Sequence, residues 1–135
     1  MADTQKHLLI VDDEAALRSA IAERLADQGF TVVQAGSGEE AMPLLAEFAF
    51  DIVITVLRLP GMGGRDGLGA AVERDPDIIA IVITGYGTVK DAVDAIKQGA
   101  ADFVTKAFQF VALLHVVRSA VKLPRVKWEN AYPRS

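Results

Sequence analysis

The feature that most constrains the fold of this chain is an alternation, repeated five times, between short apolar runs and longer stretches of helical periodicity. The runs are rich in Val and Ile and have the length of strands, which is typical of strands buried on both faces. The alternation predicts a doubly wound α/β fold, in which helices cover both faces of a parallel sheet. The five predicted strands are His7–Val11, Phe30–Val33, Ile52–Val56, Ile78–Ile83 and Phe103–Val104.

The first two predicted helices lie before the third strand. Apolar residues recur every four positions from Leu17 to Leu25, so one face of the first helix should be buried. Ser37 and Glu40 have the spacing of a capping box, which begins the second helix. Pro43 should kink or shorten this helix, because proline lacks a backbone donor.

Three further helices follow the third, fourth and fifth strands. The third, near Asp66–Arg74, contains Gly67 and Gly69. Each glycine costs about 1 kcal/mol relative to alanine inside a helix, so this helix should be the weakest. The fourth carries Val and Ile at helical spacing before Gly99, and the fifth has an apolar stripe over Phe110–Val121.

The length and composition predict one folded domain. The chain has 135 residues, and domains cluster at roughly 100 to 150 residues. Hydrophobic residues make up 51% of the chain, which is ample for one core and is not typical of a disordered chain. The predicted domain covers residues 5–121, and residues 122–135, which contain two prolines, are expected to form a tail or linker.

Charge and residue usage exclude several classes of function. The net charge is −4 without a marked basic stripe, so nucleic-acid binding is not expected. The chain contains no cysteine, which excludes disulfides, thiolate metal sites and a cysteine nucleophile. Its longest apolar-rich run, Phe108–Val117, is shorter than the roughly 20 residues that span a membrane. Met1–Lys6 is polar and no signal-peptide core follows it, so a cytoplasmic location is expected.

Acidic, hydroxyl and amino groups follow the predicted strands at one edge of the sheet. Asp12 and Asp13 follow the first strand, Thr84 the fourth and Lys106 the fifth, while Val56 ends the third. Singly, each has an ordinary explanation as a helix cap, a turn residue or a surface charge. Together they lie where an open α/β sheet binds its ligand. Two carboxylates can hold a hard divalent cation there, and a lysine can neutralise phosphate.

Four segments around this edge resemble the receiver domains of response regulators. They are His-Leu-Leu-Ile-Val-Asp-Asp-Glu at 7–14, Asp-Ile-Val-Ile-Thr-Val-Leu-Arg-Leu-Pro-Gly-Met at 51–62, Ile-Thr-Gly-Tyr-Gly-Thr-Val at 83–89 and Gly-Ala-Ala-Asp-Phe-Val-Thr-Lys at 99–106. They are most similar to the branch found on enhancer-binding transcriptional activators for nitrogen assimilation and dicarboxylate transport. The resemblance covers about residues 7–121. It implies a flavodoxin-like strand order of 2-1-3-4-5 and a sensor histidine kinase as partner in a two-component phosphorelay.

The resemblance also implies a role for each group at the carboxyl edge. Two acids and a backbone carbonyl would hold Mg²⁺, and an aspartate ending the third strand would take a phosphoryl group from phosphohistidine. A hydroxyl and an ammonium would contact that phosphoryl group, and an aromatic residue would change rotamer as a switch. Phosphoryl transfer needs mainly positioning and charge neutralisation, so this set is sufficient. The residues are Asp12, Asp13 and the Arg58 carbonyl for the metal, Thr84 and Lys106 for the phosphoryl group, and Phe103 for the switch.

The sequence departs from this pattern at two positions. Val56 stands at the acceptor position and offers neither a nucleophile nor a metal ligand, so Mg²⁺ should bind weakly. Asp51 should lie roughly 16 Å away at the opposite edge, because each strand residue rises about 3.3 Å. Asp13 is nearer and remains an alternative acceptor. Ala107 replaces the usual proline, so the peptide bond after Lys106 should be trans and the loop displaced.

The leading hypothesis is a receiver module that is not phosphorylated in the usual way and acts through protein contacts, locked in one conformation. A phosphatase of the haloacid-dehalogenase type is an alternative, but it expects an Asp-x-Asp pattern where this chain has Asp12-Asp13-Glu14. A flavin-binding electron carrier needs a hydroxyl and glycine loop after the first strand, and acids there would repel its phosphate.

A homodimer is expected through the fourth helix, the fifth strand and the fifth helix. Val111, Val116 and Ala120 lie beyond the predicted core stripe of the fifth helix, and such apolar residues need cover. The output domain is expected to lie outside this chain.

Overall fold

The computed structural model describes residues 6–56, 64–75, 77–84, 89–105 and 109–122. Within these ranges, five strands alternate with five helices along the sequence. The strands are β1 (His7–Val11), β2 (Thr31–Ala35), β3 (Ile52–Val56), β4 (Ile79–Thr84) and β5 (Asp102–Thr105). The helices are α1 (Ala15–Asp27), α2 (Gly38–Glu47), α3 (Gly64–Arg74), α4 (Val89–Lys97) and α5 (Phe110–Lys122).

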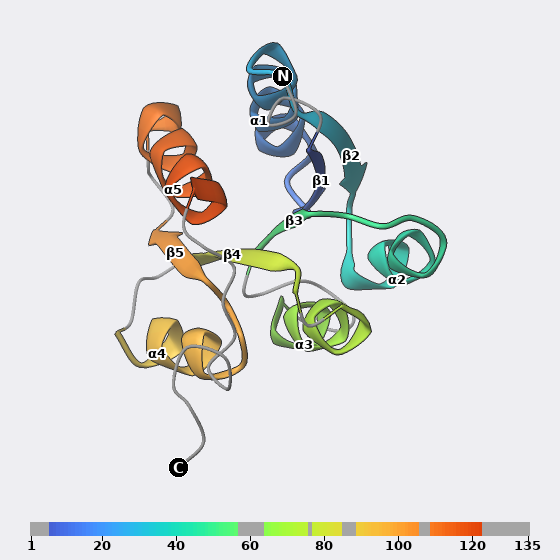
Figure 1. Cartoon of the computed structure of the whole chain (residues 1–135), viewed down its shortest axis with the longest axis vertical. Helices are drawn as coiled ribbons and strands as arrows, with labels where there is room; N and C mark the ends of the chain where they lie inside the picture. The colour runs from blue at the N-terminus through green and yellow to red at the C-terminus, as the bar shows by residue number, and fades with distance from the viewer. Residues whose placement is uncertain (1–5, 57–63, 76, 85–88, 106–108, 123–135) are drawn as a thin grey trace.

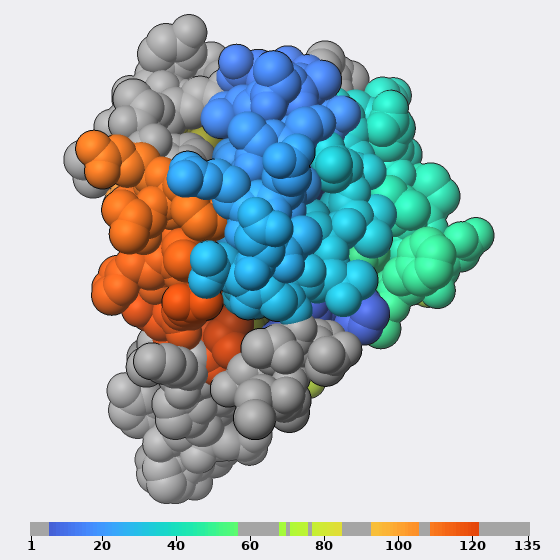
Figure 2. All heavy atoms as spheres, turned by 90° about the horizontal axis from the view of Figure 1, so that it is seen from above, coloured from blue at the N-terminus to red at the C-terminus, as the bar shows by residue number. Residues whose placement is uncertain are grey.

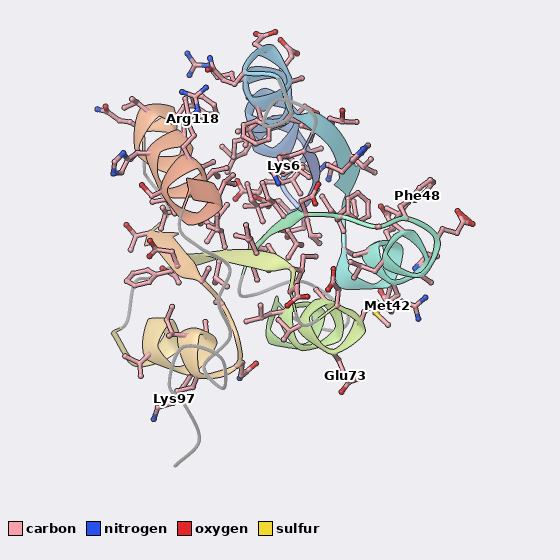
Figure 3. All side chains as sticks on the ribbon, in the orientation of Figure 1. Lys6, Met42, Phe48, Glu73, Lys97 and Arg118 are labelled. Carbon is pink, nitrogen blue, oxygen red and sulfur yellow. The ribbon has the colours of Figure 1, made fainter. Side chains whose placement is uncertain are left out.

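The strands form one parallel sheet in the order β2-β1-β3-β4-β5, which confirms the predicted doubly wound fold. Figure 1 shows α1 and α5 on one face of the sheet and α2, α3 and α4 on the other. Glu73 on α3 and Lys97 on α4 point away from the sheet (Figure 3), as expected for helices that bury one side. No helix in the described ranges combines the length and apolar character needed to cross a membrane.

The central strands are apolar except at Thr55 and Thr84, because helices cover both of their faces. Every residue of β3 and β4 is buried, whereas the edge strands β2 and β5 have exposed positions. Parallel pairing places Val56 beside Ile83 and Thr84 beside Thr105. The carboxyl ends of β3, β4 and β5 therefore lie at the same edge of the sheet.

Several element boundaries differ from the predictions. Backbone pairing in β2, β4 and β5 continues past the last apolar residue, through Gln34, Thr84 and Thr105. Phe30 and Ile78 instead close turns, because their N–H groups donate back to preceding carbonyls. The observed ranges replace the predicted ones as follows: β2 is Thr31–Ala35 and not Phe30–Val33, β4 is Ile79–Thr84 and not Ile78–Ile83, β5 is Asp102–Thr105 and not Phe103–Val104, and α3 is Gly64–Arg74 and not Asp66–Arg74.

The start of α2 is capped as its sequence predicts. The Ser37 hydroxyl accepts a hydrogen bond from the Glu40 N–H at 3.1 Å, and the Glu40 carboxylate accepts from the Gly36 N–H at 2.8 Å. The carboxylate thus reaches one residue further back than in a standard capping box. Pro43 does not shorten the helix, because α2 continues through it to Glu47, and the alternative expectation of a kink stays a prediction.

Helices α1 and α5 lie side by side, as the space-filling view in Figure 2 shows. The Arg24 guanidinium lies 4.9 Å from the centre of the Phe110 ring, a cation–π contact. Further along α5, the Arg118 guanidinium donates to the Gln28 side-chain oxygen at 2.6 Å. These contacts hold the two helices together above the sheet.

The predicted outer stripe of α5 needs correction. Val116 and Ala120 are partly buried and pack against the hydrophobic core, so they do not lie beyond it. Val111 is 66% exposed, as predicted. The apolar positions of α5 cover a wider arc than the predicted stripe because both the sheet and α1 lie against this helix.

Gly99, just after α4, has a backbone conformation that favours glycine. Its φ is +116°, and an added Cβ would lie 3.0 Å from Val72 Cγ1. We expect Gly99→Ala to lower the free energy of unfolding by about 1–3 kcal/mol, measured by urea denaturation. Gly69, inside α3, is the control because a Cβ there meets nothing within 4 Å. Gly69→Ala should raise stability by about 1 kcal/mol, and a Gly99→Ala protein as stable as the unmodified chain would contradict the expectation.

Candidate functional site

Three residues predicted from the sequence meet at the carboxyl edge of the sheet. Val11 pairs with Thr55 and Val56 with Ile83, so β1, β3 and β4 end close together. Asp12 directly follows β1, Val56 ends β3 and Thr84 ends β4, and all three are buried. This edge therefore encloses a carboxylate, a hydrocarbon side chain and a hydroxyl.

Three hydrogen bonds from described residues hold the Asp12 main chain and carboxylate. Its N–H donates to the Ala35 carbonyl at 3.1 Å, which extends the pairing of β1 with β2 by one residue. Its Oδ1 accepts from the Glu14 N–H at 2.9 Å, and its carbonyl accepts from Arg18 Nη1 at 2.8 Å. Glu14 is the N-cap residue of α1. Asp12 is thus not the cap of this helix and instead orders the loop before it.

Asp13 lies next to this buried acid and is exposed. The two adjacent carboxylates therefore differ in environment, with one fixed inside the edge and one open to solvent. Among the described residues, no group of three or more His, Cys, Asp or Glu side chains could hold a metal ion.

The Thr84 hydroxyl is fully buried and finds no hydrogen-bond partner among the residues that the structure describes. A buried hydroxyl without a partner costs about 1–3 kcal/mol. Beside it in the sheet, β3 ends with the buried Val56 side chain. The Val56 carbonyl accepts a bond from the Thr55 hydroxyl at 3.3 Å. The carboxyl end of β4 thus carries a buried polar atom, next to a strand that ends in a hydrocarbon side chain.

The other candidate residues lie elsewhere or outside the described ranges. Asp51 is at the amino edge of the sheet, where its carboxylate accepts from the His7 N–H at 2.9 Å and its carbonyl from the Ile79 N–H at 3.0 Å. This confirms that Asp51 is remote from Val56. Phe103 is partly exposed on β5. Arg58, Lys106 and Ala107 lie outside the described residues, so their predicted roles stay predictions.

Sequence reasoning missed the contact made by Arg18 on α1. Arg18 Nε donates to the Gln34 side-chain oxygen at 3.0 Å, in addition to the bond from Nη1 to the Asp12 carbonyl. The position of Arg18 in the first turn of the helix could have predicted this contact. Helical side chains lean toward the N-terminus, so an arginine one turn into α1 reaches back over the loop that precedes the helix.

The chain is a parallel α/β domain of strand order 2-1-3-4-5, with a buried acid after β1 and a buried hydroxyl at the end of β4. These features are typical of flavodoxin-like domains that have their site at the carboxyl edge of the sheet. The family model of the response regulator receiver domain matches residues 8–118. This chain belongs to the response regulator receiver domain family. It is a signalling module of a two-component system and not an enzyme, so the phosphatase and flavin-carrier alternatives are wrong.

The chain is similar to several response regulators, one of which is named as a transcriptional regulatory protein. The chain is 42% identical over 110 residues to the response regulator protein FleR of Pseudomonas aeruginosa, covering 82% of this chain and 23% of that protein. It is 39% identical over 124 residues to the C4-dicarboxylate transport transcriptional regulatory protein DctD of Rhizobium meliloti, covering 91% and 27%. The crystal structure of the receiver domain of NtrX from Brucella abortus superposes with a TM-score of 0.80 at 30% identity, covering 85% and 98%. The chain thus spans about a quarter of the curated relatives' length.

Receiver domains typically bind Mg²⁺, and the acids at this edge are of the kind that it requires. Mg²⁺ prefers hard oxygen ligands and keeps several waters when one or two carboxylates hold it. Asp12 supplies a buried carboxylate and Asp13 an exposed one. The buried Thr84 hydroxyl is a further polar atom at the same edge. These residues fit a magnesium ion that is bound largely through water.

Proposed function

We propose that Val56 occupies the position at which receiver domains carry their phosphate-accepting aspartate, so that this receiver is not phosphorylated on β3. The observation that carries the proposal is the place of Val56, buried at the carboxyl end of β3. β3 lies between β1, which leads to Asp12, and β4, which ends at Thr84. An aspartate at this point would complete an acidic site, and valine does not.

The chemistry of the side chain supports this proposal. Formation of an aspartyl phosphate needs a carboxylate oxygen as nucleophile, and the valine side chain is a hydrocarbon. Asp51 does not replace it, because its carboxylate is engaged at the amino edge of the sheet. Asp13 is an exposed acid that directly follows the buried Asp12, and it is the acceptor to test first if phosphorylation is found.

A receiver without an acceptor acts through its surface. We propose that the domain stays in one conformation and signals by protein contacts. Its proposed partner is a histidine kinase of a two-component system. Because the curated relatives are about four times as long as the matched segment, an output domain in transcription regulation is proposed to lie beyond this chain. Magnesium is proposed to bind weakly at Asp12 and Asp13, with the Arg58 carbonyl, Thr84 and Lys106 at the same edge.

The direct test is phosphorylation by a small-molecule donor. We expect the unmodified chain, incubated with acetyl phosphate and Mg²⁺, to gain no phosphoryl mass in intact-protein mass spectrometry, because Val56 offers no nucleophile. A related receiver that retains its aspartate serves as the positive control. Stoichiometric labelling of the unmodified chain would overturn the proposal, and loss of that label in Asp13→Asn would identify the alternative acceptor.

A second copy of the chain is the proposed partner of an apolar surface around β5. Val93 and Ile96 on α4, Phe103 on β5 and Val111 on α5 are exposed hydrophobic residues. Their three elements lie on the same side of the molecule in Figure 1. Exposed apolar residues grouped in this way are typical of interaction sites. Phe103, proposed as the switch aromatic, would lie within this surface.

We expect sedimentation at high protein concentration to show self-association, and Ile96→Lys to reduce it, because a charge would be buried in the interface. Met42→Lys on α2 is the matched control, since Met42 is 41% exposed and Ile96 42% exposed. A strictly monomeric unmodified chain, or equal effects of the two substitutions, would count against this dimer.

A further inference from the structure

Arg18 connects the loop after β1 to strand β2. Its Nη1 donates to the Asp12 carbonyl at 2.8 Å and its Nε to the Gln34 side-chain oxygen at 3.0 Å. Gln34 lies in β2, and its side-chain oxygen also accepts from the Ser19 hydroxyl at 3.4 Å. Arg18 is half-buried, and its guanidinium joins the loop after β1 to β2.

We infer that Arg18 is a positioning residue for the acidic pair, which holds Asp12 in the orientation that a divalent cation needs. The inference rests on the proposed role of Asp12 and Asp13 as the metal-binding acids. The Asp12 N–H is fixed by the Ala35 carbonyl of β2, and the Asp12 carbonyl is fixed by Arg18. Both bonds lead back to the end of β2, so the Asp12 backbone is anchored on both sides of its Cα.

The strength of this anchor follows from its chemistry. A hydrogen bond from a charged guanidinium to a carbonyl is stronger than one between neutral groups, and the planar fork of arginine fixes its direction. Asp13 follows the held carbonyl directly in the chain, so the same bond restrains the peptide that joins the two acids. A restraint at this peptide fixes the backbone from which both carboxylates project.

The backbone after β2 leaves room for this guanidinium. A Cβ built at Gly36 would lie 3.2 Å from Arg18 Nη1 and 3.4 Å from Glu40 Oε1. The Gly36 N–H already donates to Glu40, so a side chain there would have to displace the arginine, the glutamate or both. A side chain at position 36 would therefore crowd Arg18, which gives an independent way to disturb its contact.

The charge of Arg18 has an effect opposite to that of its hydrogen bonds. A guanidinium close to a metal site repels the cation, so its removal could strengthen metal binding. Arg18→Lys separates the two effects, because lysine keeps the charge but loses the two-pronged contact. Arg18→Met removes both. If positioning dominates, both variants bind Mg²⁺ more weakly; if repulsion dominates, only Arg18→Met changes and it binds more tightly.

The experiment measures Mg²⁺ affinity by calorimetry, with the melting temperature of the metal-free protein recorded in parallel. The variants are made in the unmodified chain and in Val56→Asp, which is expected to bind the metal more tightly. We expect Arg18→Met and Arg18→Lys to weaken Mg²⁺ binding about tenfold, the scale typical of partners that orient metal ligands. Arg24→Met is the matched control, because Arg24 lies on the same helix but contacts Phe110. It should leave Mg²⁺ affinity unchanged even where it lowers the melting temperature.

An unchanged affinity in both Arg18 variants, or tighter binding in Arg18→Met alone, would overturn the inference while leaving the proposed metal site intact. If neither the unmodified chain nor Val56→Asp binds Mg²⁺, the metal role of the acids fails, and the role of Arg18 fails with it. Gly36→Ala supplies a second route should Arg18→Met not fold. It should weaken Mg²⁺ binding in the same direction but less, because the arginine has only to shift by a few tenths of an ångström.

Discussion

Val56→Asp is expected to gain one phosphoryl group when incubated with acetyl phosphate and Mg²⁺, whereas the unmodified chain gains none. The substitution places a carboxylate at the buried carboxyl end of β3, in the strand next to the one that leads to Asp12. It would supply both a nucleophile and a third acidic ligand for the metal. The readout is intact mass, followed by loss of the label at alkaline pH, to which acyl phosphates are labile.

Val56→Asn is the matched control for this gain, because it has nearly the shape of aspartate but no carboxylate nucleophile. It should remain unlabelled under the same conditions. If Val56→Asp also remains unlabelled while binding Mg²⁺, the absent nucleophile is not the sole defect. The departure at Ala107, with its expected displacement of Lys106, would then be the next position to change, by Ala107→Pro.

The same substitution is expected to destabilise the metal-free protein. Val56 is 4% exposed, and Val56→Asp would replace its packing with a charge close to the buried Asp12 carboxylate. Burying an uncompensated charge costs about 3 kcal/mol, so the free energy of unfolding should fall by roughly that amount without metal. Mg²⁺ should recover part of the loss because it binds only the folded state, by about 2.7 kcal/mol at a hundred times its dissociation constant.

Urea unfolding in EDTA and in saturating Mg²⁺ measures both effects. Val56→Asn separates the lost packing from the added charge, and it should lose less stability than Val56→Asp and respond little to Mg²⁺. The unmodified chain should gain less from Mg²⁺ than Val56→Asp. A metal-free Val56→Asp protein as stable as the unmodified chain would show that position 56 does not share its surroundings with the acids.

Much of the fold could be predicted because its signals are local. Short runs of Val and Ile are buried on both faces in β3 and β4, and the strand order followed from the family resemblance. The ends of strands were less predictable, because pairing continues through Gln34, Thr84 and Thr105, whose polarity suggests a loop. Backbone hydrogen bonding decides where a strand ends, and polarity follows it only in part.

The site was predictable where position along a strand decides it. Asp12, Val56 and Thr84 lie at the predicted edge of the sheet, because residues at the carboxyl ends of parallel strands must share an edge, although Thr84 belongs to β4 and does not follow it. The contact made by Arg18 was not predicted from the sequence, since it depends on the path of a long side chain that passes close to Gly36. This path has no spacing that a sequence pattern would reveal.

The two edges of the sheet differ in how firmly they are tied. At the amino edge, Asp51 bonds to β1 through its side chain and its N–H and to β4 through its carbonyl, so three adjacent strands are joined at one residue. At the carboxyl edge, the Thr84 hydroxyl has no bond among the described residues. The amide hydrogens of His7, Asp51 and Ile79, which all donate in the network around Asp51, should therefore exchange slowly. Adjustments on ligand binding can then occur at one end of the strands while the other end keeps their register.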